Sequence, residues 1–145
     1  MVKKKAGFTL LELMIGVCVL IVALVGLLSV FAHMISLNEN SSKLTLGVAA
    51  CQAKLEEMRN STFSILYTTY NNTSFNPSGF ATGEAKGAIS INNSNPNLLQ
   101  VSVNVSWRTR SNRVIGGDQN LNGVLDAGES SLNSPASITT LIGQR

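Results

Sequence analysis

A lone carboxylate at the head of a long apolar run constrains this chain more than any other feature. Glu12 is followed by residues 13–32, a stretch that contains no charged side chain. A helix of that length spans about 30 Å, which is the hydrocarbon thickness of a bilayer. A carboxylate at membrane depth is costly without a partner and is therefore a functional residue by default. The sequence predicts an N-terminal membrane helix in which Glu12 pairs with a positive group.

The residues before Glu12 offer that positive group. Three lysines at positions 3–5 precede Ala6, Gly7 and Phe8. Cleavage between Gly7 and Phe8 would place a new α-amine one helical turn from Glu12. The amine could then pair with Glu12 of its own chain or of a neighbouring copy. The lysines also indicate that this end of the helix faces the cytoplasm.

This N-terminal stretch resembles the type IV prepilin signal, in which a short basic leader ends at Gly and is followed by Phe and Thr-Leu-Leu-Glu. The resemblance covers about the first 30 residues. It implies cleavage after Gly7 by a prepilin peptidase/methyltransferase, N-methylation of Phe8, and assembly with other pilin or pseudopilin subunits through Glu12. A secretory signal peptide would have a shorter apolar core with its cleavage site behind it. A plain membrane anchor would leave Glu12 unexplained.

The net charge of +3 and the pI of about 9.1 come from the leader. Without the three leader lysines, the eleven basic residues become eight, equal to the eight acidic residues. The basic balance therefore indicates membrane topology, and no nucleic-acid partner is expected. We expect a single-pass protein of the inner (cytoplasmic) membrane with an extracytoplasmic head, which then enters a pilus or pseudopilus.

The cysteine and histidine content argues against catalysis. On one continuous helix, Cys18 and Cys51 would lie about 50 Å apart, so we expect two unpaired, apolar thiols and no disulfide. The only histidine, His33, follows the apolar run and is interpreted as an interfacial residue. The chain contains no Ser/His/Asp set, zinc-ligand spacing or phosphate-binding loop. We therefore expect no enzymatic activity.

A second helical pattern continues directly from the apolar run. Its apolar positions repeat at helical spacing and are Leu37, Leu44, Val48, Cys51, Leu55 and Met58. Such a stripe predicts one face packed against a protein core. We therefore expect a leader at 1–7, a transmembrane half-helix at 8–36, an amphipathic half-helix at 37–66 and a β-rich head at 67–145.

Within the head, residues 67–85 are predicted to form a loop, and strands are predicted at 87–92, 98–108 and 137–142. The clearest strand has Leu99, Val101, Val103, Val105 and Trp107 on one face and polar residues on the other. The expected fold is α+β and pilin-like: a long N-terminal helix packed on a small antiparallel sheet. The Val-x-Val-x-Trp strand and the basic segment after it are similar to minor pilins of the PilV class and to minor pseudopilin I of type II secretion. The absence of proline before Pro77 also favours a minor subunit or a pseudopilin.

Residues 118–129 match the twelve-position EF-hand calcium loop without its flanking helices. The expected ligands are the side chains of Asp118, Asn120, Asn122, Asp126 and Glu129 and the carbonyl of Val124. Gly123 permits the sharp turn, and Leu125 would anchor the loop. The pattern predicts a structural Ca²⁺ site; the alternative is an ordinary Asn/Gly-rich turn.

Two functions remain open from the sequence. The first is a minor pilin or pseudopilin that assembles into a type IV pilus or a type II secretion pseudopilus, at initiation or at the tip. The alternative is a membrane-tethered, calcium-binding adhesion or binding module that does not polymerise. Glu12 favours the first, because a tether does not need a carboxylate at that depth.

Overall fold

The computed structural model describes residues 9–95 and 97–144 of the chain. These residues form two compact units, one ending at Glu39 and the other beginning at Asn40. Helix α1, Leu10–Arg59, contributes to both units without a break. It is the one helix among the described residues that is long and apolar enough to cross a membrane. Its length and composition suit a membrane anchor or a signal sequence.

In the first unit, α1 exposes large apolar side chains along its whole length, from Leu10 to Leu37. The first turn is capped by Thr9, whose hydroxyl oxygen accepts a hydrogen bond from the main-chain N–H of Glu12 at 3.2 Å. Thr at the cap and Glu three residues later form the sequence pattern of a capping box. The hydrogen bond to Thr9 provides a partner for one of the main-chain N–H groups that have no intrahelical acceptor at the start of an α-helix.

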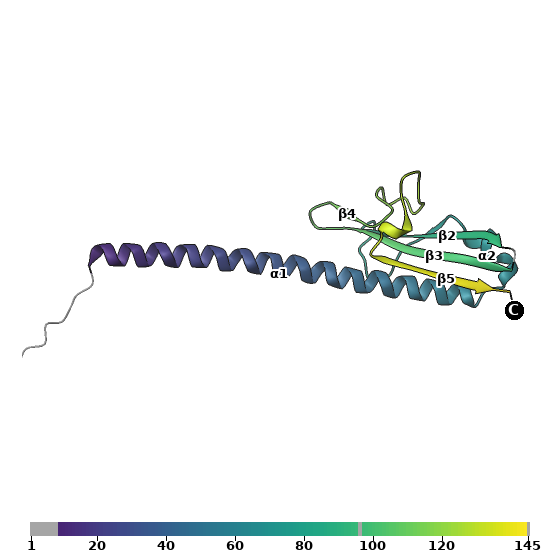
Figure 1. Ribbon diagram of the computed structural model, residues 1–145, viewed down its shortest axis with the longest axis horizontal. Coiled ribbons are helices and arrows are strands. Elements are labelled where there is room, and N and C mark those ends of the chain that lie inside the picture. The colour runs from purple at the N-terminus through teal and green to yellow at the C-terminus, as the bar shows by residue number, and fades with distance from the viewer. Residues whose placement is uncertain (1–8, 96, 145) are drawn as a thin grey trace, which may run out of the picture. The chain divides into compact units, whose positions relative to one another are not determined.

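The second unit contains an antiparallel sheet. Its strands are β1 (Thr73–Phe75), β2 (Ala85–Asn95), β3 (Leu98–Arg108), β4 (Val114–Ile115) and β5 (Ala136–Gly143). Figure 1 shows β2, β3 and β5 side by side, and β5 pairs with β3. β1 pairs with β2, and β4 pairs with the last two residues of β3. The three predicted strands are confirmed as β2, β3 and β5, and β3 has the predicted bounds.

The core lies between one face of the sheet and the part of α1 from Gly47 to Arg59. The apolar face of β3 is buried from Leu99 to Trp107, together with Cys51, Leu55 and Met58 of the helix. Burying a Val, Leu or Met side chain fully contributes about 1.5–3 kcal/mol each. The predicted α+β class, with a long helix packed against an antiparallel sheet, is therefore confirmed. The predicted stripe is correct from Val48 onward, but Leu37 and Leu44 remain exposed.

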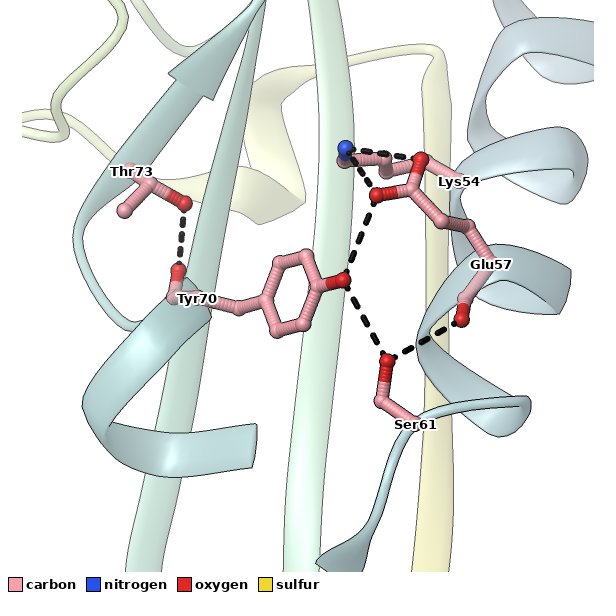
Figure 2. A network of polar contacts seen from close by, with 5 residues as sticks. All are labelled: Lys54, Glu57, Ser61, Tyr70 and Thr73. Atoms are coloured by element: carbon pink, nitrogen blue, oxygen red, sulfur yellow. Dashed lines mark hydrogen bonds and ion pairs between the residues drawn. The ribbon is translucent and has the colours of Figure 1, made fainter. Parts of the chain in front are cut away.

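Helix α1 ends at Arg59, before the predicted bound of 66, and two short regular elements follow in place of the end of that half-helix and the start of the predicted loop at 67–85. Helix α2, Phe63–Tyr70, and strand β1 precede the turns that lead into β2. Figure 2 shows the side chain of Tyr70 turned towards α1, where its hydroxyl donates to Glu57 Oε1 at 3.2 Å and lies 3.3 Å from Ser61 Oγ. Lys54 Nζ forms hydrogen bonds with both Glu57 oxygens, at 2.7 and 2.9 Å.

The same lysine also faces two aromatic rings. Lys54 Nζ lies 5.4 Å from the ring centre of Tyr70 and 5.7 Å from that of Phe75. A cation over an aromatic face is attracted by the ring quadrupole. The hydrogen bond from Lys54 lowers the pKa of Glu57 below its ordinary value, with smaller contributions from the charge of Lys54 and then from the Tyr70 hydrogen bond. These contacts with α1 therefore stabilise α2 and β1. The local sequence pattern does not predict them.

The second face of β3 is only partly the solvent-exposed surface that its polar residues predict. Gln100 is exposed, but Asn104 and Ser106 are fully buried. Residues 116–134, which connect β4 to β5 and include a 3-10 helix η1 at Ser131–Asn133, cover this end of the strand. The sheet is thus covered by apolar packing on one face and by a polar segment at one end of the other.

Candidate functional site

The predicted processing residues, Gly7 and Phe8, lie outside the described residues. Glu12 lies in the first turn of α1 with an exposed side chain. The bond between its main-chain N–H and Thr9 gives this position a local role in starting the helix. Pairing of the Glu12 carboxylate with the amine of Phe8 stays a prediction.

The start of the predicted calcium loop is held against β3. The N–H of Asp118 donates to Ser106 Oγ at 3.1 Å, and the N–H of Gly117 donates to Ser134 Oγ at 2.6 Å. The two hydroxyl groups lie 3.4 Å apart. Ser106 and Ser134 were not among the residues that sequence reasoning selected. A serine on the polar face of a strand carries no signal that a distant loop will cover it.

Asp118 organises the first half of the loop from a fully buried position. Its Oδ1 accepts the N–H of Asn122 at 3.2 Å, and its Oδ2 accepts the N–H of Gly123 at 2.7 Å. Gly123 adopts a φ of 83°, a conformation in which a side chain is strained. A Cβ at Gly123 would also collide with Ser74 of β1. The sharp turn predicted at Gly123 is therefore present, and it packs closely against the sheet.

Glu129 closes the loop. Its Oε1 accepts the N–H of Gln119 at 2.8 Å, and its Oε2 accepts the N–H of Asp126 at 3.0 Å. The bond to Gln119 brings the last loop position back to the first residues, whereas the bond to Asp126 is local. A carboxylate that joins both ends of a twelve-residue loop occupies the place where the EF-hand pattern requires a bidentate ligand.

The middle positions are joined through Asp126. Its Oδ2 accepts hydrogen bonds from the amide nitrogens of Asn120 and Asn122, both at 2.9 Å. The amide oxygens of the same two residues accept main-chain N–H groups, with Asn122 Oδ1 accepting from Val124 at 2.7 Å. The five predicted side chains are thus connected by hydrogen bonds within one loop, and Leu125 is half-buried.

The donor set has the chemistry of a calcium site rather than that of a transition-metal site. Carboxylate, amide and carbonyl oxygens are the ligands of a hard cation. Among the described residues, no three side chains of His, Cys, Asp or Glu are grouped closely enough to hold a metal by themselves. A cation here would therefore need the amide oxygens of Asn120 and Asn122 as well as the carboxylates. Their amide nitrogens, which face Asp126, would have to turn away.

The cysteine and histidine positions form no catalytic group with each other. Cys51 is fully buried, and its thiol contacts the carbonyl oxygen of Ala136 at 3.6 Å. Burial raises the pKa of this thiol to about 12, so it stays protonated and unreactive at neutral pH. His33 Nδ1 lies 3.0 Å from the carbonyl oxygen of Ser29 on the preceding turn. Both described cysteines are free, as their predicted separation requires.

The class that this fold defines is pilin-like: a long N-terminal apolar helix whose C-terminal part packs against an antiparallel sheet. Comparison of the chain with models of protein families, with curated proteins and with solved structures found no match in any of the three.

Proposed function

We propose that this chain is a minor pilin or pseudopilin, a structural subunit rather than an enzyme. In this proposal, a prepilin peptidase/methyltransferase removes residues 1–7 and methylates the amine of Phe8. The mature subunit then leaves the inner membrane and joins a type IV pilus or a type II secretion pseudopilus. The Val-x-Val-x-Trp strand and the proline-free helix favour a minor pilin of the PilV class or minor pseudopilin I. We propose that the subunit acts at initiation or at the tip.

One observation carries the proposal: α1 is uninterrupted from Leu10 to Arg59. Its first part exposes apolar side chains on all sides, and its last part forms one side of the core of the head. A cleavable signal sequence would have no reason to continue as the main core helix of the protein that it exports. The helix therefore supports a subunit that keeps its apolar segment after processing.

Glu12 separates this function from the alternative of a membrane-tethered binding module. In an assembly of apolar helices, a carboxylate is tolerated when a positive group pairs with it. The Phe8 amine of an adjacent subunit would provide that group and would set the axial register between subunits. A tether that never polymerises would gain nothing from Glu12 beyond the capping pattern.

Calcium binding by residues 118–129 belongs to the same proposal. The support is the order of oxygen ligands, the turn at Gly123, and the return of Glu129 to the loop start. In the described residues the head contains no disulfide, and the loop is the longest connection between its strands. A bound Ca²⁺ would have to draw the carboxylates of Asp118, Asp126 and Glu129 closer than they lie in the structure, and it would neutralise their charges.

The decisive experiment replaces Glu12 by Ala in the full-length chain, with Glu56→Ala as the matched control. Glu56 lies on the same helix, but its exposed carboxylate pairs only with Arg59, at 2.7 Å. Removing one partner of a buried ion pair costs about 3–5 kcal/mol, whereas an exposed pair is worth little. We expect the Glu12 variant to be processed normally but absent from sheared filaments or pseudopili, and the Glu56 variant to be incorporated.

Mass spectrometry of membrane-extracted protein tests the processing step separately. The expected N-terminus is N-methylated Phe8. Recovery of an intact Met1 chain as the functional form, or normal incorporation of the Glu12→Ala variant, would overturn the proposed assembly. Genes next to that of this chain would distinguish a pilus, with its retraction motor, from a secretion pseudopilus, with its outer-membrane channel.

A further inference from the structure

Strand β5 forms an edge of the sheet whose outer side has no strand partner among the described residues. The N–H of Gln144 donates to the carbonyl oxygen of Asn97 at 3.1 Å, on the side that faces β3. Because main-chain groups alternate between the two sides of a strand, the residue before Gln144 directs its groups outward. The outward set is therefore Ser137, Thr139, Leu141 and Gly143. Thr139, Leu141 and Gly143 are exposed.

This edge lacks the features that usually prevent another strand from pairing. The sequence of β5, Ala-Ser-Ile-Thr-Thr-Leu-Ile-Gly, contains no charge and no proline. Its register with β3 runs without a bulge from Ala136 to Gly143. Natural proteins usually protect edges with charges, prolines, bulges or very short strands. The opposite edge is protected in this way, since β1 has three residues and the amide of Asn71 accepts the Ile91 N–H at 2.9 Å.

A groove of about 700 Å³ begins where the β5 edge ends. It is lined by the C-terminal end of α1, the start of α2 and the last residues of β5; these residues are Arg59, Asn60, Ser61, Thr62, Phe63, Ser64, Leu66, Leu141, Ile142, Gly143 and Gln144. Leu141 and Gly143 belong to both the edge and the groove, so the two surfaces are continuous. Among the described residues that line the groove, Arg59 carries a positive charge and none carries a carboxylate.

Arg59 is available to a new anionic partner. Its guanidinium pairs with Glu56 at 2.7 Å, but the two side chains are 50% and 65% exposed. Ion pairs this exposed contribute little to stability and exchange readily with solvent or with another anion. A carboxylate entering the groove would meet a positive charge, polar groups and no competing negative charge from the lining.

We propose that the β5 edge and this groove form a strand-addition site for an extended peptide segment of another protein. The segment carries no charge on the face that it shares with Ile138 and Ile142, and it has a carboxylate at the end that enters the groove. Charged side chains are excluded on the face of the added strand that would lie beside half-buried Ile138 and Ile142, because there they would lose their hydration. In this mode, main-chain hydrogen bonds supply affinity and the side-chain groups supply specificity. The site requires neither filament assembly nor calcium.

The test measures binding of a fluorescent synthetic peptide to the full-length chain in detergent micelles by anisotropy. The probe is acetyl-Glu-Thr-Val-Thr-Val-Thr-Val-Thr-amide, which would run antiparallel to β5 with its Glu at the groove. One companion peptide has Gln in place of Glu, and another has N-methyl groups on the amides that would face β5. We expect the Gln peptide to bind about tenfold more weakly and the N-methylated peptide not to bind. Equal binding of all three, or no binding of the first, would overturn the proposal.

Two pairs of protein variants locate the site. Leu141→Pro removes an outward N–H and leaves the bonds to β3 intact, whereas Leu141→Ala keeps that N–H. We expect a loss of at least tenfold in affinity for the first and less than about twofold for the second. Arg59→Gln should abolish the preference for the Glu peptide, and Glu56→Gln should retain or increase it. Should Leu141→Pro fail to fold, the N-methylated peptide provides the same information. If the chain self-associates and Leu141→Pro abolishes that self-association, the occupant is a second copy of the chain. That result would overturn the assignment to another protein.

Discussion

The ammonium group of Lys43 lies 2.6 Å from Oε1 of Glu84, across the junction between α1 and the turn that enters β2. Lys43 Nζ also donates to the carbonyl oxygen of Arg108 at 3.1 Å, and Glu84 Oε2 accepts the N–H of Ala81 at 2.9 Å. The Lys43 side chain is 12% exposed. One ion pair therefore connects the helix, the turn before β2 and the end of β3.

Lys43→Met should lower the free energy of unfolding by about 1–3 kcal/mol, because hydrogen bonds to charged groups contribute that much and Glu84 loses its partner. The matched control is Arg59→Met, which breaks a more exposed pair worth about 0.3–0.5 kcal/mol. Urea denaturation of both variants measures the difference. Equal effects would show that the buried position of Lys43 confers no advantage.

The same pair predicts a pH dependence. The hydrogen bond from Lys43, and then that from Ala81, holds the pKa of Glu84 below its ordinary value in the folded state. A carboxyl group with a lowered folded pKa stabilises the protein above its unfolded pKa, about 4.3, and this stability is lost as the pH falls through the folded pKa. We expect wild type to lose more stability than Lys43→Met between about pH 5 and pH 3. Parallel pH profiles of the melting temperature would contradict this assignment.

Gly47 marks the closest approach of α1 to the sheet. A Cβ on Gly47 would lie 2.9 Å from the Cβ of Ala136, which is too close for two rigid groups. Gly47→Ala gains about 0.5–1 kcal/mol of helix propensity but forces the packed elements apart, at about 1–3 kcal/mol. We expect net destabilisation in thermal melts. Adding Ala136→Gly should restore part of the loss, and a purely additive double variant would show that the two sites do not touch.

Asn104 is fully buried on β3, and neither its amide oxygen nor its amide nitrogen has a hydrogen-bond partner among the described residues. A buried amide without partners costs about 1–3 kcal/mol. Asn104→Val should therefore raise the free energy of unfolding by about 1 kcal/mol. Ser106→Ala, two residues along the same face, should lower it, because Ser106 accepts the Asp118 N–H. A lower melting temperature for Asn104→Val would indicate that a water molecule satisfies the amide.

Calcium should stabilise the head through residues 118–129. With a dissociation constant of about 10⁻⁴–10⁻³ M, typical of extracellular modules, a tenfold excess of Ca²⁺ over that value adds about 1.4 kcal/mol. The single tryptophan, Trp107, is buried and reports unfolding by fluorescence. We expect a higher melting temperature with Ca²⁺ than with Mg²⁺ or chelator, and no such rise in Glu129→Ala. An equal response to both ions would identify the segment as an Asn/Gly-rich turn.

The cap at Thr9 separates the two roles available to Glu12. Thr9→Ala removes the hydroxyl that accepts the Glu12 N–H and should cost about 1 kcal/mol at the helix start, whereas Thr9→Ser keeps the hydroxyl. If Glu12 acts in assembly through its charge, both Thr9 variants will still enter filaments. Loss of incorporation in Thr9→Ala alone would show that capping accounts for the requirement at this position.

Local periodicity was sufficient to predict the main architecture. The apolar run and the stripe from Val48 to Met58 specify one long helix, because helical spacing places those side chains on one face. Strict alternation specifies β3, including its bounds. The strand predicted at 137–142 matches β5 within one residue at each end. The order of oxygen-bearing residues from Asp118 to Glu129 was also sufficient to select the loop as a candidate site.

Only the tertiary structure decided the rest. Helix α2 and β1 form where residues 63–75 lack a clear periodic pattern, because Tyr70 reaches Glu57 and Lys54 on a helix that precedes it in the chain. The burial of Asn104 and Ser106 depends on a segment that returns over β3 more than ten residues later. A polar segment that covers a strand in this way produces no hydrophobic pattern in the sequence, because its contacts are hydrogen bonds between residues distant in the chain. The sequence therefore determined which elements pack through apolar faces, and tertiary contacts determined which polar residues become buried and which loop they hold.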